Sequence, residues 1–120
     1  MRRPERVAEL LREEISEIVG FELDDPRVLA VTVTEVRVAS DLRDAKVFVL
    51  VEGDEKEISA ALAALQHAAP YVRRQVGTAL NLRHTPALHF VRDTVEERGA
   101  RVDQLLAEIQ RESFDRKDEE

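Results

Sequence analysis

The chain has 120 residues, of which 43% are hydrophobic and 36% charged, and its net charge is −7. This length predicts one domain, and the absence of cysteine and of any apolar run near ~20 residues excludes disulfide, thiolate and transmembrane classes. No apolar segment follows the basic N-terminus as it would in a secretory signal, so we expect a cytoplasmic protein without membrane contact.

The first predicted element is a helix from Pro4 to Val19, closed by Gly20. Its apolar residues recur at steps of three and four and form one stripe of Val7, Leu10, Leu11, Ile15, Ile18 and Val19. Proline is favoured in the first turn of a helix, and glycine just past the last turn. Residues 21–27 contain turn-forming aspartates and a proline, so we expect a loop there.

Two β-strands are predicted next, over Val28–Val38 and Ala45–Val51. Both are rich in β-branched residues, and a turn over residues 40–44 joins them. The alternation of the first strand changes phase, which indicates a β-bulge near Thr34 and Glu35. The second strand has apolar residues on both faces, so we expect it in the centre of the sheet.

A helical stretch follows, and Pro70 is predicted to interrupt it. The first part has acidic residues at its start, where the helix dipole favours them, and a stripe of Ile58, Ala61, Leu62 and Leu65. Proline lacks the N–H that a helix needs and disfavours the α conformation of the residue before it. A second helix from Pro70 would bury Val72, Val76, Ala79 and Leu80. We therefore expect a helix, a kink at Ala68-Ala69-Pro70 and a second helix.

The last elements are a loop, a strand over residues 88–91 and a C-terminal helix with a stripe of Val102, Leu105, Leu106 and Ile109. The predicted boundaries are one domain over residues 1–95, a helical extension over 96–112 and a disordered acidic tail over 113–120. The order α-β-β-α-kink-α-β predicts an α+β fold, in which helices cover one face of a three-stranded sheet.

One internal segment carries no acid. Residues 58–92 contain Arg73, Arg74, Arg83 and Arg92, whereas all 25 acids lie in the other 85 residues. Local fields, more than net charge, steer a charged partner. This segment is therefore the part of the chain suited to face an anion.

Two adjacent arginines lie close to the predicted kink. If Val72 and Val76 face the core, Arg74 points to solvent and Arg73 lies at the rim of the buried face. Two ordinary surface arginines are the simpler interpretation. A second helix that begins at Pro70 favours a binding site, because free N–H groups at a helix start bind phosphate.

Further candidates for nucleic-acid contact follow in the same segment. Arg83 and His84 come after the second helix, and Tyr71 is an aromatic beside the kink, with core packing an equal alternative. The chain has only four Phe and one Tyr, so stacking along a strand is not expected to dominate. Recognition of the backbone and shape of a single-stranded nucleic acid is the better prediction.

The sequence offers little for catalysis or metal binding. No HExxH, Walker or GxSxG motif is present, and Ser40-Asp41 is explained by its place in a turn. The spacing of His67, His84 and His89 matches no common zinc pattern. We expect no enzyme, no metal and no cofactor.

Four segments of the chain carry a likeness to known proteins: Arg6–Val19, Asp25–Val49, Ala64–Asp93 and Glu97–Leu106. Asp25-Pro26-Arg27, the hairpin around Ser40-Asp41-Leu42 and the ending around Leu82-Arg83 are jointly specific. In this order the segments resemble the bacterial ribosome-binding factor A family over nearly the whole chain.

The resemblance implies a type II KH domain over residues 1–95. It also implies a factor that binds the rRNA of an immature small ribosomal subunit, with neighbouring ribosomal proteins, and assists late maturation without catalysis. KH domains usually hold nucleotide backbones with a GxxG loop. The family has an Ala-x-Gly kink instead, and in this chain Pro70 replaces that glycine, which stiffens the kink and removes one N–H.

The predicted RNA-binding residues are Tyr71, Arg73, Arg74, Arg83, His84 and Lys46. We expect a monomer with the small ribosomal subunit as partner and no small-molecule substrate. The alternative is a protein–protein adaptor or homodimer that uses the sheet and the C-terminal helix without contacting RNA.

Overall fold

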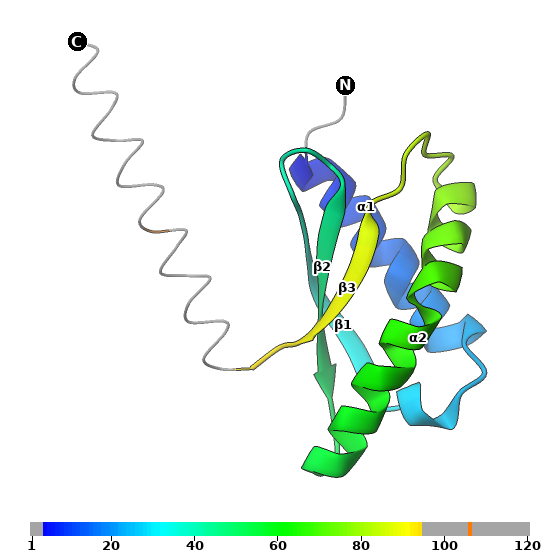
Figure 1. Ribbon diagram of the computed structural model, residues 1–120, viewed down its shortest axis with the longest axis vertical. Coiled ribbons are helices and arrows are strands. Elements are labelled where there is room, and N and C mark those ends of the chain that lie inside the picture. Colours follow the sequence, from blue (N-terminus) through cyan, green and yellow to red (C-terminus); the bar gives the residue numbers. More distant parts are fainter. Residues whose placement is uncertain (1–3, 95–105, 107–120) are drawn as a thin grey trace.

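The computed structural model describes residues 4–94 and residue 106 (Figure 1). Its elements are α1 (Pro4–Glu17), the π turn η1 (Ile18–Glu22), the 3₁₀ turn η2 (Pro26–Val28), β1 (Val31–Val38), β2 (Asp44–Val51), α2 (Glu55–Ala79) and β3 (Ala87–Arg92). The predicted helical extension over 96–112 and the tail over 113–120 lie outside the described residues, apart from residue 106.

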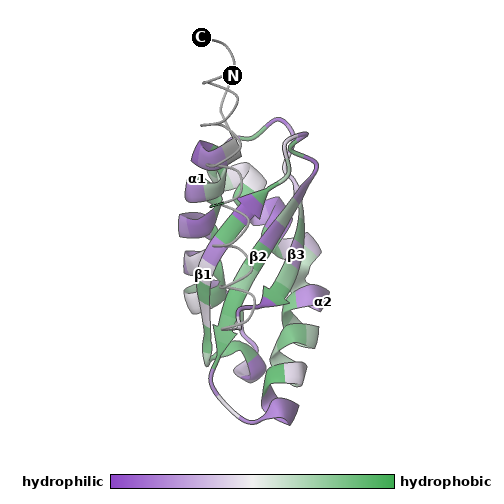
Figure 2. Ribbon diagram, turned by 90° about the vertical axis from the view of Figure 1, so that its left-hand side faces the viewer, coloured by the Kyte–Doolittle hydropathy of each residue, from purple (hydrophilic) through white to green (hydrophobic). Residues whose placement is uncertain are grey.

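The three strands form one mixed sheet in the order β1-β2-β3. β1 is antiparallel to β2, and β3 is parallel to β2. Helix α1 packs on β1 and α2 packs on β3. Both helices lie on one face of the sheet, and Figure 2 looks onto the other face. The structure is therefore the two-layer α+β fold that the sequence predicts.

The core lies between β2 and the two helices. The inner face of β2 buries Ala45, Val47, Val49 and Val51, and Phe48 is buried on the opposite face. The predicted central position of this strand is confirmed. The largest core side chains from the helices include Leu11, Ile15, Leu65, Val72 and Val76, which are fully buried. Each contributes about 1.5–3 kcal/mol by leaving water.

The predicted β-bulge is confirmed, because the register shifts between Val33 and Glu35. The bulge gives the Thr34 hydroxyl a partner across the sheet. Thr34 Oγ1 lies 2.6 Å from Asp93 Oδ2 and 3.2 Å from the carbonyl oxygen of Phe48. Asp93 is only 4% exposed, and a buried carboxylate is costly unless a donor reaches it. The extra residue therefore supplies a donor to a buried acid.

The end of α1 differs from the prediction. The α-helix ends at Glu17 and continues as a π turn, in which the N–H of Leu23 donates to the carbonyl oxygen of Ile18 at 3.1 Å. Gly20 therefore lies inside this turn instead of closing the helix. The wider turn keeps both Ile18 and Val19 buried, which explains why the apolar stripe extends past the α-helix.

The first strand begins later than predicted, at Val31 instead of Val28. Val28 belongs to η2, whose N-cap is Asp25: its Oδ1 accepts the N–H of Arg27 at 2.9 Å. The side chain of Val28 is buried and anchors this turn in the core. Capping and burial together take these residues out of the strand.

Helix α2 runs unbroken through Pro70, so the predicted break into two helices is wrong. Pro70 has no N–H to donate to the carbonyl of Gln66, four residues earlier. The helix persists because one stripe on both sides of the proline is buried, and its members are Ile58, Ala61, Leu65, Ala69, Val72 and Val76. A break would lift the second half of this stripe off the sheet.

Replacing Pro70 tests this continuity. The variant Pro70→Ala is expected to raise the free energy of unfolding by up to roughly 3 kcal/mol, and Pro70→Gly by up to roughly 2 kcal/mol, because alanine and glycine both restore the N–H and alanine also favours the helix. Urea denaturation of the natural chain and of each variant measures these free energies of unfolding. A less stable Pro70→Ala protein would contradict a continuous helix at this position.

The ion pair in η2 makes a prediction about pH. Side-chain hydrogen bonds from Arg27, with its backbone N–H in addition, lower the pKa of Asp25 to about 2. Because the pKa is lowered in the folded state, the pair stabilises the protein above the ordinary pKa of aspartate, and this contribution disappears as the pH falls towards 2. NMR titration of Asp25 should show the low midpoint in the natural chain and a return towards the ordinary range in Arg27→Ala. Equal midpoints in the two proteins would refute the pairing.

Candidate nucleic-acid interface

An open depression of about 610 Å³ lies between the second half of α2 and the loop that leads to β3. Its lining contains no acid and consists of Pro70, Arg73, Arg74, Gly77, Thr78, Leu82, Arg83, His84 and Thr85. The structure thus brings together four of the predicted RNA-binding residues, Arg73, Arg74, Arg83 and His84, with Pro70 of the predicted kink.

The end of α2 directs the chain back towards the helix. Asn81 has a φ of 52°, and the N–H of Leu82 donates to the carbonyl oxygen of Gly77 at 3.0 Å. This is a Schellman arrangement, with asparagine in the left-handed position that glycine usually occupies. It places the next two residues, Arg83 and His84, beside the helix they have just left.

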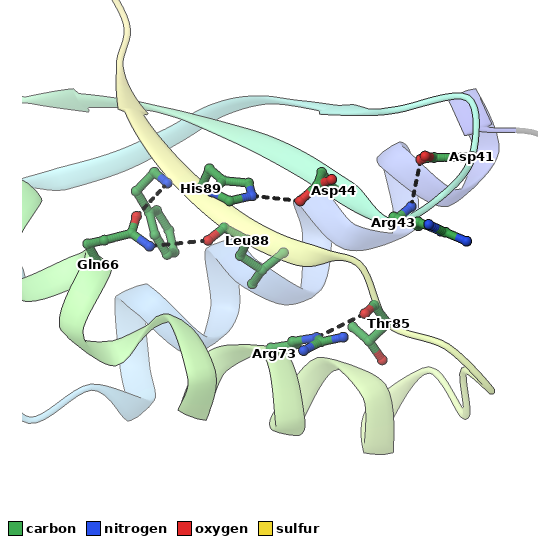
Figure 3. A network of polar contacts seen from close by, with 9 residues as sticks. Asp41, Arg43, Asp44, Gln66, Arg73, Thr85, Leu88 and His89 are labelled. Carbon is green, nitrogen blue, oxygen red and sulfur yellow. Dashed lines mark hydrogen bonds and ion pairs between the residues drawn. The ribbon is translucent and has the colours of Figure 1, made fainter.

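Thr85 holds the returning loop against α2. Arg73 Nε–H donates to the carbonyl oxygen of Thr85 at 2.9 Å (Figure 3). A Cβ atom at Gly77 would lie 2.6 Å from Thr85 Oγ1, so a larger residue in the helix would displace the threonine side chain. The arginine therefore positions the loop, besides lining the depression.

The positive charge of the depression is not neutralised within the described part of the chain. No described residue forms an ion pair with Arg73, Arg74 or Arg83, and all three are exposed. The backbone gives an anion no help, because this is the C-terminal, partly negative end of α2. The helix start predicted at Pro70 does not exist, so the side chains alone must attract a phosphate.

Three further predicted residues, Ala68, Ala69 and Tyr71, do not line the depression. Tyr71 is 38% exposed and precedes Arg74 by one turn, which puts the two side chains on neighbouring parts of the helix surface. Ala68 is half-buried and Ala69 is buried, and both pack in or against the core.

Lys46 is separated from the other predicted site residues. It lies on β2, with Arg37 and His89 as its partners on the two neighbouring strands. Ala45 and Val47, on either side of it, are buried under the helices. Because side chains alternate along a strand, Lys46 points from the face of the sheet that the helices leave open. Its contact with RNA stays a prediction, but it belongs to a different surface.

Several residues that shape the depression were not predicted. Asn81 follows the last apolar residue of α2, and asparagine at that point is a recognised sign of a helix end. Gly77 and Thr85 have no such local sign, because their contact joins residues eight apart through a reversal of the chain. Their importance follows only from the three-dimensional structure.

Gln66 is a further residue that the sequence did not single out. Its side-chain Oε1 accepts the N–H of Phe90 at 3.1 Å, and its Nε2 donates to the carbonyl oxygen of Leu88 at 3.5 Å (Figure 3). The amide thus satisfies two backbone groups along the outer edge of β3. An unpaired strand edge invites other chains to pair with it, and Gln66 covers this one.

The histidines do not come together. His67 lies on α2, His84 lines the depression, and His89 Nε2 lies 2.9 Å from Asp44 Oδ1 on the open face of the sheet. Among the described residues, no three histidine, aspartate or glutamate side chains gather as a metal site. Of the described helices, none has the length and apolar character that crossing a membrane requires.

The order of elements and the mixed sheet define a small type II KH-like domain with a basic, acid-free depression on its helical layer. The chain belongs to the ribosome-binding factor A family, because the family model of that description matches residues 3–106.

Known proteins agree with this assignment. Ribosome-binding factor A of Solibacter usitatus is 52% identical over 110 residues, which cover 92% of this chain and 89% of that protein. The crystal structure of ribosome-binding factor A from Thermus thermophilus superposes with a TM-score of 0.67 at 25% identity, covering 76% of this chain and 97% of the other. A homology model of the Thermus protein, fitted into a cryo-electron microscopy map of a 30S complex, superposes with a TM-score of 0.60 at 27% identity, covering 70% and 88% of the two chains.

Replacing Gly77 with alanine tests the contact that holds the loop. Alanine favours a helix by about 1 kcal/mol over glycine, but its Cβ would meet Thr85 Oγ1, so we expect Gly77→Ala to lower the free energy of unfolding. The double variant Gly77→Ala, Thr85→Ala removes the clash and should be more stable than Gly77→Ala alone. Urea denaturation of the two single variants and the double variant measures this coupling. A Gly77→Ala protein more stable than the natural chain would contradict the close approach.

Proposed function

We propose that this protein binds the rRNA of the immature small ribosomal subunit through the basic depression and assists the late processing and maturation of that rRNA. The observation that carries the proposal is the lining of the depression, which holds Arg73, Arg74, Arg83 and His84 and no acid. Membership of the ribosome-binding factor A family supports the ribosome as the place of binding.

The depression suits an RNA backbone for electrostatic reasons. Arg74 and Arg83 face it from the helix and from the returning loop, so a phosphate between them would meet guanidinium groups from two sides. Arginine donates in a planar fork that matches phosphate oxygens. Tyr71, at the rim, is placed to stack on an unpaired base. Because the rest of the chain is acidic, it would repel bulk RNA and restrict contact to this side.

In this proposal the protein is a binding factor without catalysis. It would act as a monomer in the cytoplasm, contact neighbouring ribosomal proteins as well as rRNA, and leave when the subunit is mature. Association with immature subunits should therefore exceed association with mature ones. The alternative, an adaptor without RNA contact, predicts binding that depends little on salt.

Neutralising one arginine of the depression tests the RNA contact. We expect Arg74→Gln or Arg83→Gln to weaken binding to small-subunit rRNA fragments roughly tenfold, because a charge-assisted hydrogen bond contributes about 1.5–3 kcal/mol. Each should also reduce the slope of log affinity against log salt concentration by about 0.7. Filter binding or fluorescence anisotropy over a salt series measures both quantities.

Lys56→Gln is the matched control. Lys56 is an exposed cation on the same helix, roughly 27 Å from Arg74 along its axis. Its replacement should leave affinity and salt slope unchanged. Folded Arg74 and Arg83 variants that bind as tightly as the natural chain, with the same salt slope, would exclude the depression as the RNA site.

A further inference from the structure

We propose that a second groove, at the opposite end of α2, docks a basic protein segment that inserts an aliphatic side chain. This inference rests on the proposed function, since the segment would belong to a protein of the small subunit. The groove has a volume of about 310 Å³ and is lined by Pro26, Arg27, Leu29, Ala30, Val51, Glu52, Glu57 and Ala60. It lies where η2, the two residues that follow it and the end of β2 meet the first turns of α2.

The groove offers apolar surface on a fixed support. Leu29 is 80% exposed, although the residue before it, Val28, is 3% exposed and anchored in the core. The N–H of Leu29 donates to the carbonyl oxygen of Pro26 at 3.4 Å, which closes the turn that presents it. A single exposed leucine is ordinary, but this one lies in a concave surface with Ala30, Val51 and Ala60.

The charge of the groove selects a cationic partner. The one cation in the lining, Arg27, is neutralised by Asp25, with Nη2 2.7 Å from Oδ2. Glu52 and Glu57 remain, and no described residue forms an ion pair with either. Glu57 also accepts the backbone N–H of Asp54 in the capping box of α2, which holds its carboxylate in place. An RNA backbone would be repelled here, whereas lysine or arginine side chains would be attracted.

The two sites can be occupied at the same time. Glu57 and Arg74 are roughly 25 Å apart along α2. One end of the helix is lined by arginines and the other by glutamates, so each end matches a partner of opposite charge. A protein with this arrangement would bridge rRNA and a basic protein segment on the same subunit.

Photocrosslinking on immature small subunits tests the partner. The full chain would carry the photoreactive amino acid benzoylphenylalanine at position 29, or for comparison at position 78, an exposed residue that lines the basic depression. We expect position 29 to crosslink to a lysine- and arginine-rich segment of a ribosomal protein, and position 78 to rRNA. Position 29 crosslinking to rRNA, to a second copy of the chain or to nothing, while position 78 still reaches rRNA, would overturn the groove and leave the proposed function standing. Loss of both crosslinks would contradict the groove and the proposed function.

Substitutions test the energetics of the same contact. Leu29→Ser and Glu52→Lys are expected to weaken association with small subunits roughly tenfold or more, without lowering affinity for an isolated rRNA fragment. The matched controls are Leu50→Ser, a partly exposed leucine on the open face of the sheet, and Glu13→Lys, an exposed acid on α1. Thermal unfolding of each variant confirms that it is folded. Folded Leu29→Ser and Glu52→Lys proteins that associate as well as their controls would refute the proposal.

Discussion

The burial of one face of α2 against the sheet is the interaction on which the rest of the structure depends. Leu65, Val72 and Val76 are fully buried, and they lie on both sides of Pro70. A proline inside a helix costs about 3 kcal/mol, while burying two valines contributes about 1.5–3 kcal/mol each. The packing outweighs the local penalty, so the helix continues and the core remains closed over β2.

The continuity of α2 also determines where a ligand can bind. An interrupted helix would have offered free N–H groups near Pro70, in the middle of the basic segment. The continuous helix has its N-terminus at Asp54, where acids cap it, and its C-terminus near Arg83. Arginine side chains therefore line the depression at one end, and glutamates border an apolar groove at the opposite end. One continuous helix thus separates two surfaces of opposite charge.

Local patterns predicted much of the fold. The phase change within the first strand indicated the bulge at Thr34, because a bulge reverses the alternation of all later side chains. Apolar residues on both faces placed β2 in the centre. The ends of the strands were less predictable. Val28 is β-branched, as strand residues often are, but capping by Asp25 and burial of the Val28 side chain place it in a turn.

The candidate site, like the fold, could be predicted from the sequence only in part. The sequence by itself determined which segment can face an anion, because the absence of acids over residues 58–92 is a property of the chain and not of its folding. Only the tertiary structure decided which of its cations meet. The turn at Asn81 and the contact of Gly77 with Thr85 place Arg83 beside the same depression as Arg73. Lys46 lies on β2 and points from the opposite face of the sheet, because side chains alternate along a strand. Asparagine signals a helix end locally, but the contact of Gly77 with Thr85 and the pairing of β2 with its neighbours form only when the chain folds back on itself.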